Sequence, residues 1–270
     1  MKQFLLVFVF LSCFAFADAK HVTGGEMTYT YLGPGIFPNS KQYKITLLLF
    51  RDENCSGCAD MPAAVTIGIF NNDNNLLYRL FENTILERTQ VLPTNSLPSC
   101  ITNPPSLSYT VGFYSLTVEL PENNAGYTST YQTCCRIDGI QNIPNGIGAT
   151  YTCNIPGTLN RPVGFTDNSP GFELGISVVC YKKPFTLDFS ATDLDGDSLV
   201  YSLCDAYNGG AATSAANITP SAPPYGSVGY FSAYSGAKPL GNLANINTST
   251  GIISGIAPGA GKYVVSVCVS

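Results

Sequence analysis

The chain has 270 residues and a formal net charge of −5, and only 11% of its residues are charged, against roughly 25% in an average soluble domain. The negative balance offers no basic surface for nucleic acid or for an anionic membrane. With one histidine, no tryptophan, 26 glycines and 18 prolines, the composition favours strands and turns over helices and leaves few acid–base catalysts.

The first segment, MKQFLLVFVFLSCFAFADA, is predicted to be an export signal. A basic Lys2 precedes an apolar run from Phe4 to Ala17, and the small residues Ala17 and Ala19 form a cleavage pattern. The run is shorter than the ~20 apolar residues that a spanning helix needs. We therefore expect residues 1–19 to be removed and the mature protein to be secreted or displayed at the cell surface, with no membrane span.

The strands expected in the mature chain are marked by alternating apolar and polar residues, which predict half-buried strands. The clearest are QYKITLLLF (42–50), AVTIGIF (64–70), FYSLTVEL (113–120) and YVVSVCV (263–269), and polar clusters such as NNDNN (71–75) separate them. No segment has the pattern of an amphipathic helix. The side chains expected to face a core are Tyr43, Ile45, Leu47, Leu49, Val65, Ile67, Ile69, Tyr114, Leu116, Val118, Leu120, Tyr263, Val265, Val267 and Val269.

Many short strands with regular turn signals predict an all-β fold with two β-sandwich-like domains. The polar stretch TDNSPGFEL (166–174) interrupts the strands, so we place a β-rich N-terminal domain at 20–170 and a second domain at 171–270. The tract 206–224 is rich in Gly, Ala, Ser and Pro and is expected to be a surface loop. An insertion without a role is the favoured interpretation of this tract, and a binding loop is the alternative.

The ten cysteines leave nine in the mature chain, because Cys13 lies in the predicted signal. An oxidising compartment makes disulfides the default, and an odd number leaves one thiol without a partner. We expect this to be Cys268, because KYVVSVCVS reads as a strand that is cut off midway. The sequence is then expected to be the N-terminal piece of a longer chain. The pairing of six earlier cysteines stays open: Cys55, Cys58, Cys100, Cys134, Cys135 and Cys153.

Cys55-Ser-Gly-Cys58 has the spacing of a redox motif or of half a zinc site. A redox motif usually lies in a βαβ context, which this sequence lacks. Zinc would need four ligands, and the adjacent Cys134 and Cys135 would point to opposite faces of a strand. A structural disulfide is the interpretation that we favour.

The stretch SATDLDGDSLVYSL (190–203) places Asp193, Asp195 and Asp197 at alternate positions around Gly196. Carboxylates on a tight turn can converge on calcium, which takes six to eight oxygen ligands. Asp and Gly also form ordinary turns. The spacing alone supports a metal site and a polar turn about equally.

Two segments of the predicted second domain, PFTLDFSATDLDGDSLVYSL (184–203) and INTSTGIISGIAPGAGKYVVSV (246–267), resemble the cadherin-like and immunoglobulin-like modules of bacterial surface proteins. The resemblance implies a cadherin- or immunoglobulin-like second domain, truncated at its C-terminal edge. It also implies a calcium site to which Asp193 and Asp195 contribute, and Asp197 less directly. Cadherins gather the remaining ligands from neighbouring loops and repeats.

The same resemblance implies one disulfide. In a cadherin-like sandwich, Cys180 and Cys204 would both lie at the end opposite the aspartate loop, so we expect them to pair. Cys268 would lie at the aspartate end.

The predicted first domain resembles the N-terminal region of large secreted proteins of Bacteroidota, which are gliding-motility-associated or type IX secretion substrates. The resemblance is carried by HVTGGEMTYTYLG (21–33), YKITLLLFRD (43–52), GYTSTYQTCCR (126–136) and GATYTCNIPG (148–157). It implies export and says little about activity.

The chain offers few candidates for catalysis. His21 lies near the mature N-terminus, where a mobile tail is usual, and the sequence contains no nucleophile elbow or phosphate-binding loop. The glutamates that could form a catalytic pair are scattered: Glu26, Glu82, Glu87, Glu119, Glu122 and Glu173. We therefore expect no enzymatic activity.

Together these features predict a non-enzymatic exported surface module, a spacer or adhesion segment of a larger bacterial protein, with calcium as a candidate stiffening ion. Its partner would be an unknown extracellular protein or polysaccharide. The alternative is a carbohydrate-binding module attached to a secreted enzyme. The 16 tyrosines and 15 phenylalanines would then supply stacking platforms, although in alternating strands most aromatic side chains belong to a core.

Overall fold

The computed structural model describes residues 22–55, 58–93, 97–101, 106–176, 178–210 and 218–270. These residues form fourteen strands and no helix, which confirms the all-β prediction. None of them therefore belongs to a helix that is long and apolar enough to cross a membrane. The predicted signal segment 1–19 and His21 lie outside the described residues.

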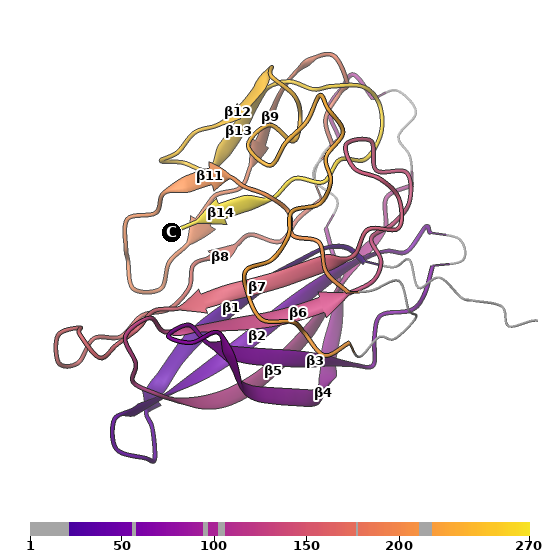
Figure 1. Ribbon diagram of the computed structural model, residues 1–270. Helices are drawn as coiled ribbons and strands as arrows, with labels where there is room; N and C mark the ends of the chain where they lie inside the picture. Colours follow the sequence, from indigo (N-terminus) through magenta and orange to yellow (C-terminus); the bar gives the residue numbers. More distant parts are fainter. Residues whose placement is uncertain (1–21, 56–57, 94–96, 102–105, 177, 211–217) are drawn as a thin grey trace, which may run out of the picture.

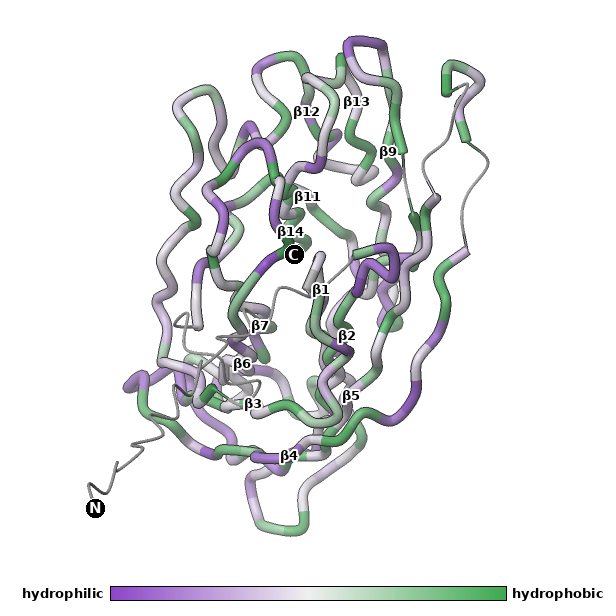
Figure 2. The backbone as a smooth tube through the Cα atoms, turned by 90° about the vertical axis from the view of Figure 1, so that its right-hand side faces the viewer, coloured by the Kyte–Doolittle hydropathy of each residue, from purple (hydrophilic) through white to green (hydrophobic). Residues whose placement is uncertain are grey.

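The first part of the chain is a single seven-stranded antiparallel sheet, in the order β1-β2-β5-β4-β3-β6-β7. The first half of β4 pairs with β3 and its last residues pair with β5, so β4 joins two facing layers. Figure 2 shows the sheet as a U, with β4 at its base and β1 and β7 at its open ends. The bounds are β1 (Val22–Pro34), β2 (Ser40–Asp52), β3 (Ala64–Asn71), β4 (Leu76–Val91), β5 (Tyr109–Pro121), β6 (Tyr127–Thr133) and β7 (Ala149–Ile155).

The interior of the U is the main core, and it is filled by the side chains that alternation predicts. Ile45, Leu47 and Leu49 of β2 have no exposed area, and Ile67 and Ile69 of β3 face them from the other layer. The predicted inward faces of 42–50, 64–70 and 113–120 are confirmed, with Leu116 only partly buried. β3 is in fact buried on both faces, and most side chains of β4 at the base of the U are exposed.

The second part of the chain consists of short strands in three small sheets, β10-β8, β11-β14 and β12-β13-β9. Its core gathers Phe185, Ala244, Ile253 and Ala257. In Figure 1 this part lies against the first sheet on the side of β1 and β7. The bounds are β8 (Gly171–Phe172), β9 (Pro184–Asp188), β10 (Ala191–Thr192), β11 (Tyr201–Leu203), β12 (Ala244–Ile246), β13 (Ile252–Ile256) and β14 (Val267–Val269).

The strand expected over 263–269 is only partly formed, since β14 begins at Val267. Ser266 still accepts the N–H of Cys204 beside β11, whereas Lys262 and Val264 bond to a loop of the first part. Lys262 bridges Ile140, and the main-chain N–H of Val264 donates to Asn142 Oδ1 at 2.9 Å. Asn142 is fully buried, and its amide also donates to the carbonyls of Pro239 and Val264 at 3.0 and 2.8 Å. One side chain therefore satisfies three main-chain groups where the two parts meet.

The tract 206–224, expected to be a surface loop, lies with its first residues along the open edge of β7. Tyr207 bridges Thr150 of β7, and Ala206 is buried in a cluster shared by the two parts. The N–H of Ser221 donates to Gln132 Oε1 at 3.0 Å. The tract is a loop with several exposed residues, as expected, but its composition does not reveal that it also supplies hydrogen-bond partners to the edge of β7.

The disulfides differ from the expected Cys180–Cys204 pair. Cys180 is joined to Cys100, with 6.3 Å between their Cα atoms, and Cys204 is joined to Cys268, with 5.9 Å between theirs. The pairing of β11 with β14 places Cys268 opposite Ser202, next to Cys204. Cys268 therefore has a partner within this chain, and among the cysteines of the described ranges the one left free is Cys153, which is buried.

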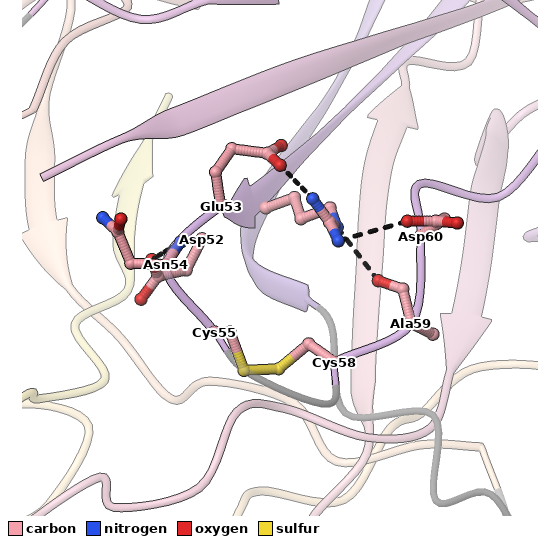
Figure 3. A network of polar contacts seen from close by, with 8 residues as sticks. Asp52, Glu53, Asn54, Cys55, Cys58, Ala59 and Asp60 are labelled. Atoms are coloured by element: carbon pink, nitrogen blue, oxygen red, sulfur yellow. Dashed lines mark hydrogen bonds and ion pairs between the residues drawn. A yellow bond between two sulfur atoms is a disulfide. The ribbon is translucent and has the colours of Figure 1, made fainter.

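The remaining cysteines form two short-range disulfides, Cys55–Cys58 and Cys134–Cys135. The first closes a loop after β2, as we favoured, and Figure 3 shows the polar contacts around it. Arg51 Nε donates to the carbonyl of Ala59 at 2.9 Å, and the guanidinium also pairs with Glu53 and with Asp60. The loop is thus held by an arginine on its inner side and by the disulfide at its tip.

The disulfide arrangement predicts one thiol per mature chain, at Cys153. We expect a thiol-alkylating reagent to label no cysteine in the folded protein, because Cys153 is 8% exposed and burial raises the pKa of its thiol, which lowers the thiolate fraction that reacts. In denaturant the reagent should label Cys153 alone. Peptide mapping without reduction checks both points, and recovery of a Cys180–Cys204 peptide would contradict the structure.

Candidate functional site

The aspartate loop connects β10 to β11 and is shaped by one of its own side chains. Asp193 Oδ1 accepts the main-chain N–H of Asp195 at 2.8 Å and that of Asp197 at 3.1 Å. Gly196 completes the turn with φ of 80°, a conformation that glycine adopts without a steric penalty. Asp193 therefore acts as the turn-forming aspartate, which leaves the side chain of Asp195 free to contact another segment.

Asp195 binds Asn168, which lies in the segment that leads out of the first sheet. Its Oδ2 accepts the main-chain N–H of Asn168 at 2.6 Å, and its Oδ1 accepts the side-chain amide of Asn168 at 2.9 Å. A carboxylate that takes two N–H donors from one residue is held in both position and orientation. The contact joins residues that are 27 positions apart in the chain.

Asn168 is in turn fixed to the open edge of β1. Its Oδ1 accepts the main-chain N–H of Tyr31 at 2.7 Å. The next residue, Ser169, accepts the N–H of Tyr29 through its hydroxyl at 2.8 Å and donates its own N–H to the carbonyl of Tyr29 at 3.0 Å. The stretch Asn168–Ser169 therefore works as a partial eighth strand, and it links the edge of β1 to Asp195.

We call the contact region of the aspartate loop, Asn168–Ser169 and β1 the junction. Two further contacts strengthen it. β8 pairs with β10 immediately before the aspartate loop, and the rings of Phe172 and Phe189 meet edge to face at 6.4 Å between centroids. Glu26 of β1 accepts the main-chain N–H of Phe172 at 3.0 Å. Burial raises the pKa of Glu26, and the hydrogen bond from Phe172 opposes that shift.

Asp167 adds a further carboxylate to the junction. Its Oδ2 accepts the hydroxyl hydrogen of Tyr29. Burial raises the pKa of Asp167, the hydrogen bond from Tyr29 opposes the rise, and the negative charges of Asp195, Asp197 and Asp193 add to it. The same surroundings raise the pKa of the Tyr29 hydroxyl, mainly through burial and then through its bond to Asp167. The junction is therefore a region of concentrated negative charge.

Of the aspartates predicted as calcium ligands, Asp193 shapes the turn and Asp195 binds Asn168 with both oxygens, a contact that we call the clamp. Across the described ranges, no group of three or more His, Cys, Asp or Glu side chains is arranged to hold a metal ion. Asp193 Oδ1 accepts hydrogen bonds from two main-chain N–H groups, and both oxygens of Asp195 bind Asn168. The residues as placed do not fit a preformed calcium site, and calcium binding stays a prediction.

Sequence reasoning missed Asp167, Asn168 and Ser169 as functional residues and treated them only as part of a boundary. A signal was available, since three residues with turn- and cap-forming side chains in succession can supply hydrogen bonds to a strand edge. Their partner strand, β1, lies about 140 residues earlier, and no local pattern identifies it.

The tyrosines do not form a sugar-stacking platform on one sheet face. Only Tyr78 on β4 and Tyr181, in the turn before β9, are classed as exposed, at 40% and 58%, and all 16 tyrosines lie within the described ranges. Several others, including Tyr43, Tyr114 and Tyr131, fill the interior of the U.

No protein-family model, curated protein or solved structure matches this chain.

The clamp predicts a measurable coupling between Asp195 and Asn168. In a double-mutant cycle with Asp195→Ala and Asn168→Ala, we expect a coupling free energy of about 1 kcal/mol, because hydrogen bonds to a charged group are strong but this pair is exposed. Urea unfolding of the four proteins measures it. Asp197→Ala, which removes a neighbouring carboxylate of the same charge, is the matched control. Additive effects of the two substitutions would show that the contact is absent in solution.

The raised pKa of Asp167 predicts a pH dependence of stability. Because the folded-state pKa lies above the ordinary value of 3.8, the folded protein binds the proton more tightly, and this stabilisation is present at low pH and is lost as pH rises through the folded pKa. Asp167→Asn mimics the uncharged form and keeps an acceptor for Tyr29. Its melting temperature relative to wild type should therefore rise between about pH 4 and pH 7. A melting-temperature difference between Asp167→Asn and wild type that decreases over that pH range would contradict the raised pKa of Asp167.

Proposed function

We propose that this chain is a rigid, non-enzymatic, exported surface module that serves as a spacer or adhesion segment of a larger bacterial protein. The observation that carries the proposal is the clamp between Asp195 and Asn168, which fixes the later part of the chain to the edge of the first sheet. A segment that separates or presents partners must hold its parts in one orientation, and this contact has that effect.

Several contacts remote from the clamp support rigidity. The Cys100–Cys180 disulfide links the loop before β5 to the segment before β9. Lys262 Nζ pairs with Asp52 Oδ2 at 3.1 Å, and Asn142 binds the later part at three points. Contacts inside one chain usually resemble transient interfaces and permit relative motion. Here a covalent bond and buried hydrogen bonds oppose such motion.

The chemistry of the junction supports a mechanical role over a catalytic one. Asp193, Asp195 and Asp167 accept hydrogen bonds from main-chain N–H groups, from an amide and from a hydroxyl. A general acid or base must instead reach a proton of the substrate. Each of these carboxylates already has a partner within the protein.

The proposal is tested by locating the protein and by assaying the rival function. In bacterial cells that express the full chain with an epitope tag, antibody should label intact cells, and added protease should remove the label. A cytoplasmic protein of the same cells, tagged identically, is the control and should stay unlabelled. Label that appears only after lysis would refute export and display.

The alternative, a carbohydrate-binding module, is assayed with the purified protein by electrophoresis through gels that contain soluble polysaccharides. The proposed module should migrate as it does in gels without polysaccharide. Retardation by one polysaccharide would favour the alternative, and substitution of Tyr78 or Tyr181 would then locate the face.

Calcium at the junction is the alternative that the sequence predicts, and the observation in its favour is that the negative charges of Asp193, Asp195 and Asp197 add to the burial that raises the pKa of Asp167. Binding would require Asp195 to release Asn168. Because Asp195 already uses both oxygens, we expect the melting curves in excess calcium and in chelator to coincide. A native-only site at 100 times its dissociation constant would add ~2.7 kcal/mol. A rise of several degrees in calcium that Asp195→Asn abolishes would establish the site that the sequence predicts.

A further inference from the structure

The later part contains an apolar groove beside β9. It has a volume of about 790 Å³, within the ~300–1,000 Å³ typical of sites for small molecules. Its apolar lining comes from segments that are distant in sequence. These side chains are Val179, Phe185, Leu187, Leu240, Ala257 and Val265.

The apolar lining belongs to a core that is not fully covered. Phe185 and Ala257 are buried in the core of the later part, whereas Val179, Leu187, Leu240 and Val265 are only partly buried against it. β9, which contributes two of these residues, pairs with β13 and, among the described strands, with no strand on its other side. The groove thus exposes apolar side chains that a ligand with a hydrocarbon body would cover.

The rim of the groove carries positive charge. Lys182 and Lys183 line it and both are exposed, and the lining residues include no aspartate or glutamate. Neither ammonium group has a carboxylate partner among the residues that the structure describes. In a chain with a net charge of −5, two unpaired cations beside an apolar groove are a local reversal of sign.

We infer that the groove binds an amphiphile with a single hydrocarbon chain and an anionic head, of the fatty-acid class. The chain would lie on Phe185, Leu187 and Val265, and the carboxylate would face Lys182 and Lys183. Charge complementarity selects this occupant. A purely apolar ligand, or an apolar strand of another protein, would gain nothing from two cations at the rim.

The site is tested with purified full-length protein and cis-parinaric acid, a fatty acid that becomes fluorescent in apolar surroundings. We expect saturable binding of one molecule per chain, with displacement by palmitate. The variant Lys182→Gln/Lys183→Gln should weaken binding about tenfold, because each exposed or rim charge contributes up to ~1 kcal/mol. Lys238→Gln, another exposed lysine outside the groove, is the matched control and should bind as wild type does.

A second variant separates the site from non-specific adsorption. Ala260 lines the groove and is exposed, so Ala260→Glu adds a repelling charge without disturbing a core. It should weaken binding of the fatty acid more than binding of the matching fatty alcohol. Sedimentation of the unliganded protein tests the rival occupant. The inference is overturned by absence of saturable binding, by equal binding of all variants, or by a dimer that Ala260→Glu dissociates, since a second copy would then fill the groove.

Discussion

The structure depends on how the two open edges of a U-shaped sheet are satisfied. β1 and β7 end the sheet with main-chain groups that face no further strand, and such edges invite pairing with other chains. Later segments of the same chain cover both. Asn168 and Ser169 bond to Tyr29 and Tyr31 of β1, and the carbonyl of Tyr207 accepts the N–H of Thr150 of β7 at 3.3 Å.

The coverage of the β1 edge by Asn168 also determines where the aspartate loop attaches to the first sheet. Because Asn168 is already fixed to β1, any group that binds Asn168 becomes attached to the first sheet, and Asp195 does so with both oxygens. The loop thereby connects the small sheets of the later part to the main core. The proposed role as a rigid module follows from this connection, while the groove beside β9 lies in a part of the later segment whose apolar surface the edge contacts leave exposed.

Local pattern was enough to predict β2, β3 and β5 of the first sheet and their inward faces, because alternation records directly which side chains are buried. Ile45, Leu47, Ile67 and Ile69 are completely buried as expected. The order of the strands could not be read in the same way. β4 bends to join two layers, and β6 and β7 extend the layer that begins with β3. Those pairings depend on contacts between distant segments.

The wrong or missing predictions share one cause, which is that each depends on contacts between residues distant in the sequence. The expected Cys180–Cys204 pair came from a family resemblance, whereas the register of β11 with β14 brings Cys268 to Cys204. Residues 263–266 have the alternation of a strand, but the main chain of Val264 bonds to Asn142 instead of to a strand. The three aspartates lie in a turn shaped by Asp193, which was one of the two alternatives that their spacing left open. The partner of Asp195, Asn168, was not predicted, since nothing near Asp195 in the sequence identifies it.

Hydrogen exchange of main-chain amides at increasing denaturant concentrations tests the central claim most directly. If the later part completes the edges of the first sheet, the amides of Tyr29, Tyr31 and Thr150 should open together with those of β9 and β13, in one cooperative step with one free energy. If β9 and β13 open at a lower free energy while the three edge amides stay protected, the two parts are independent, and the account of the junction as a structural clamp is wrong.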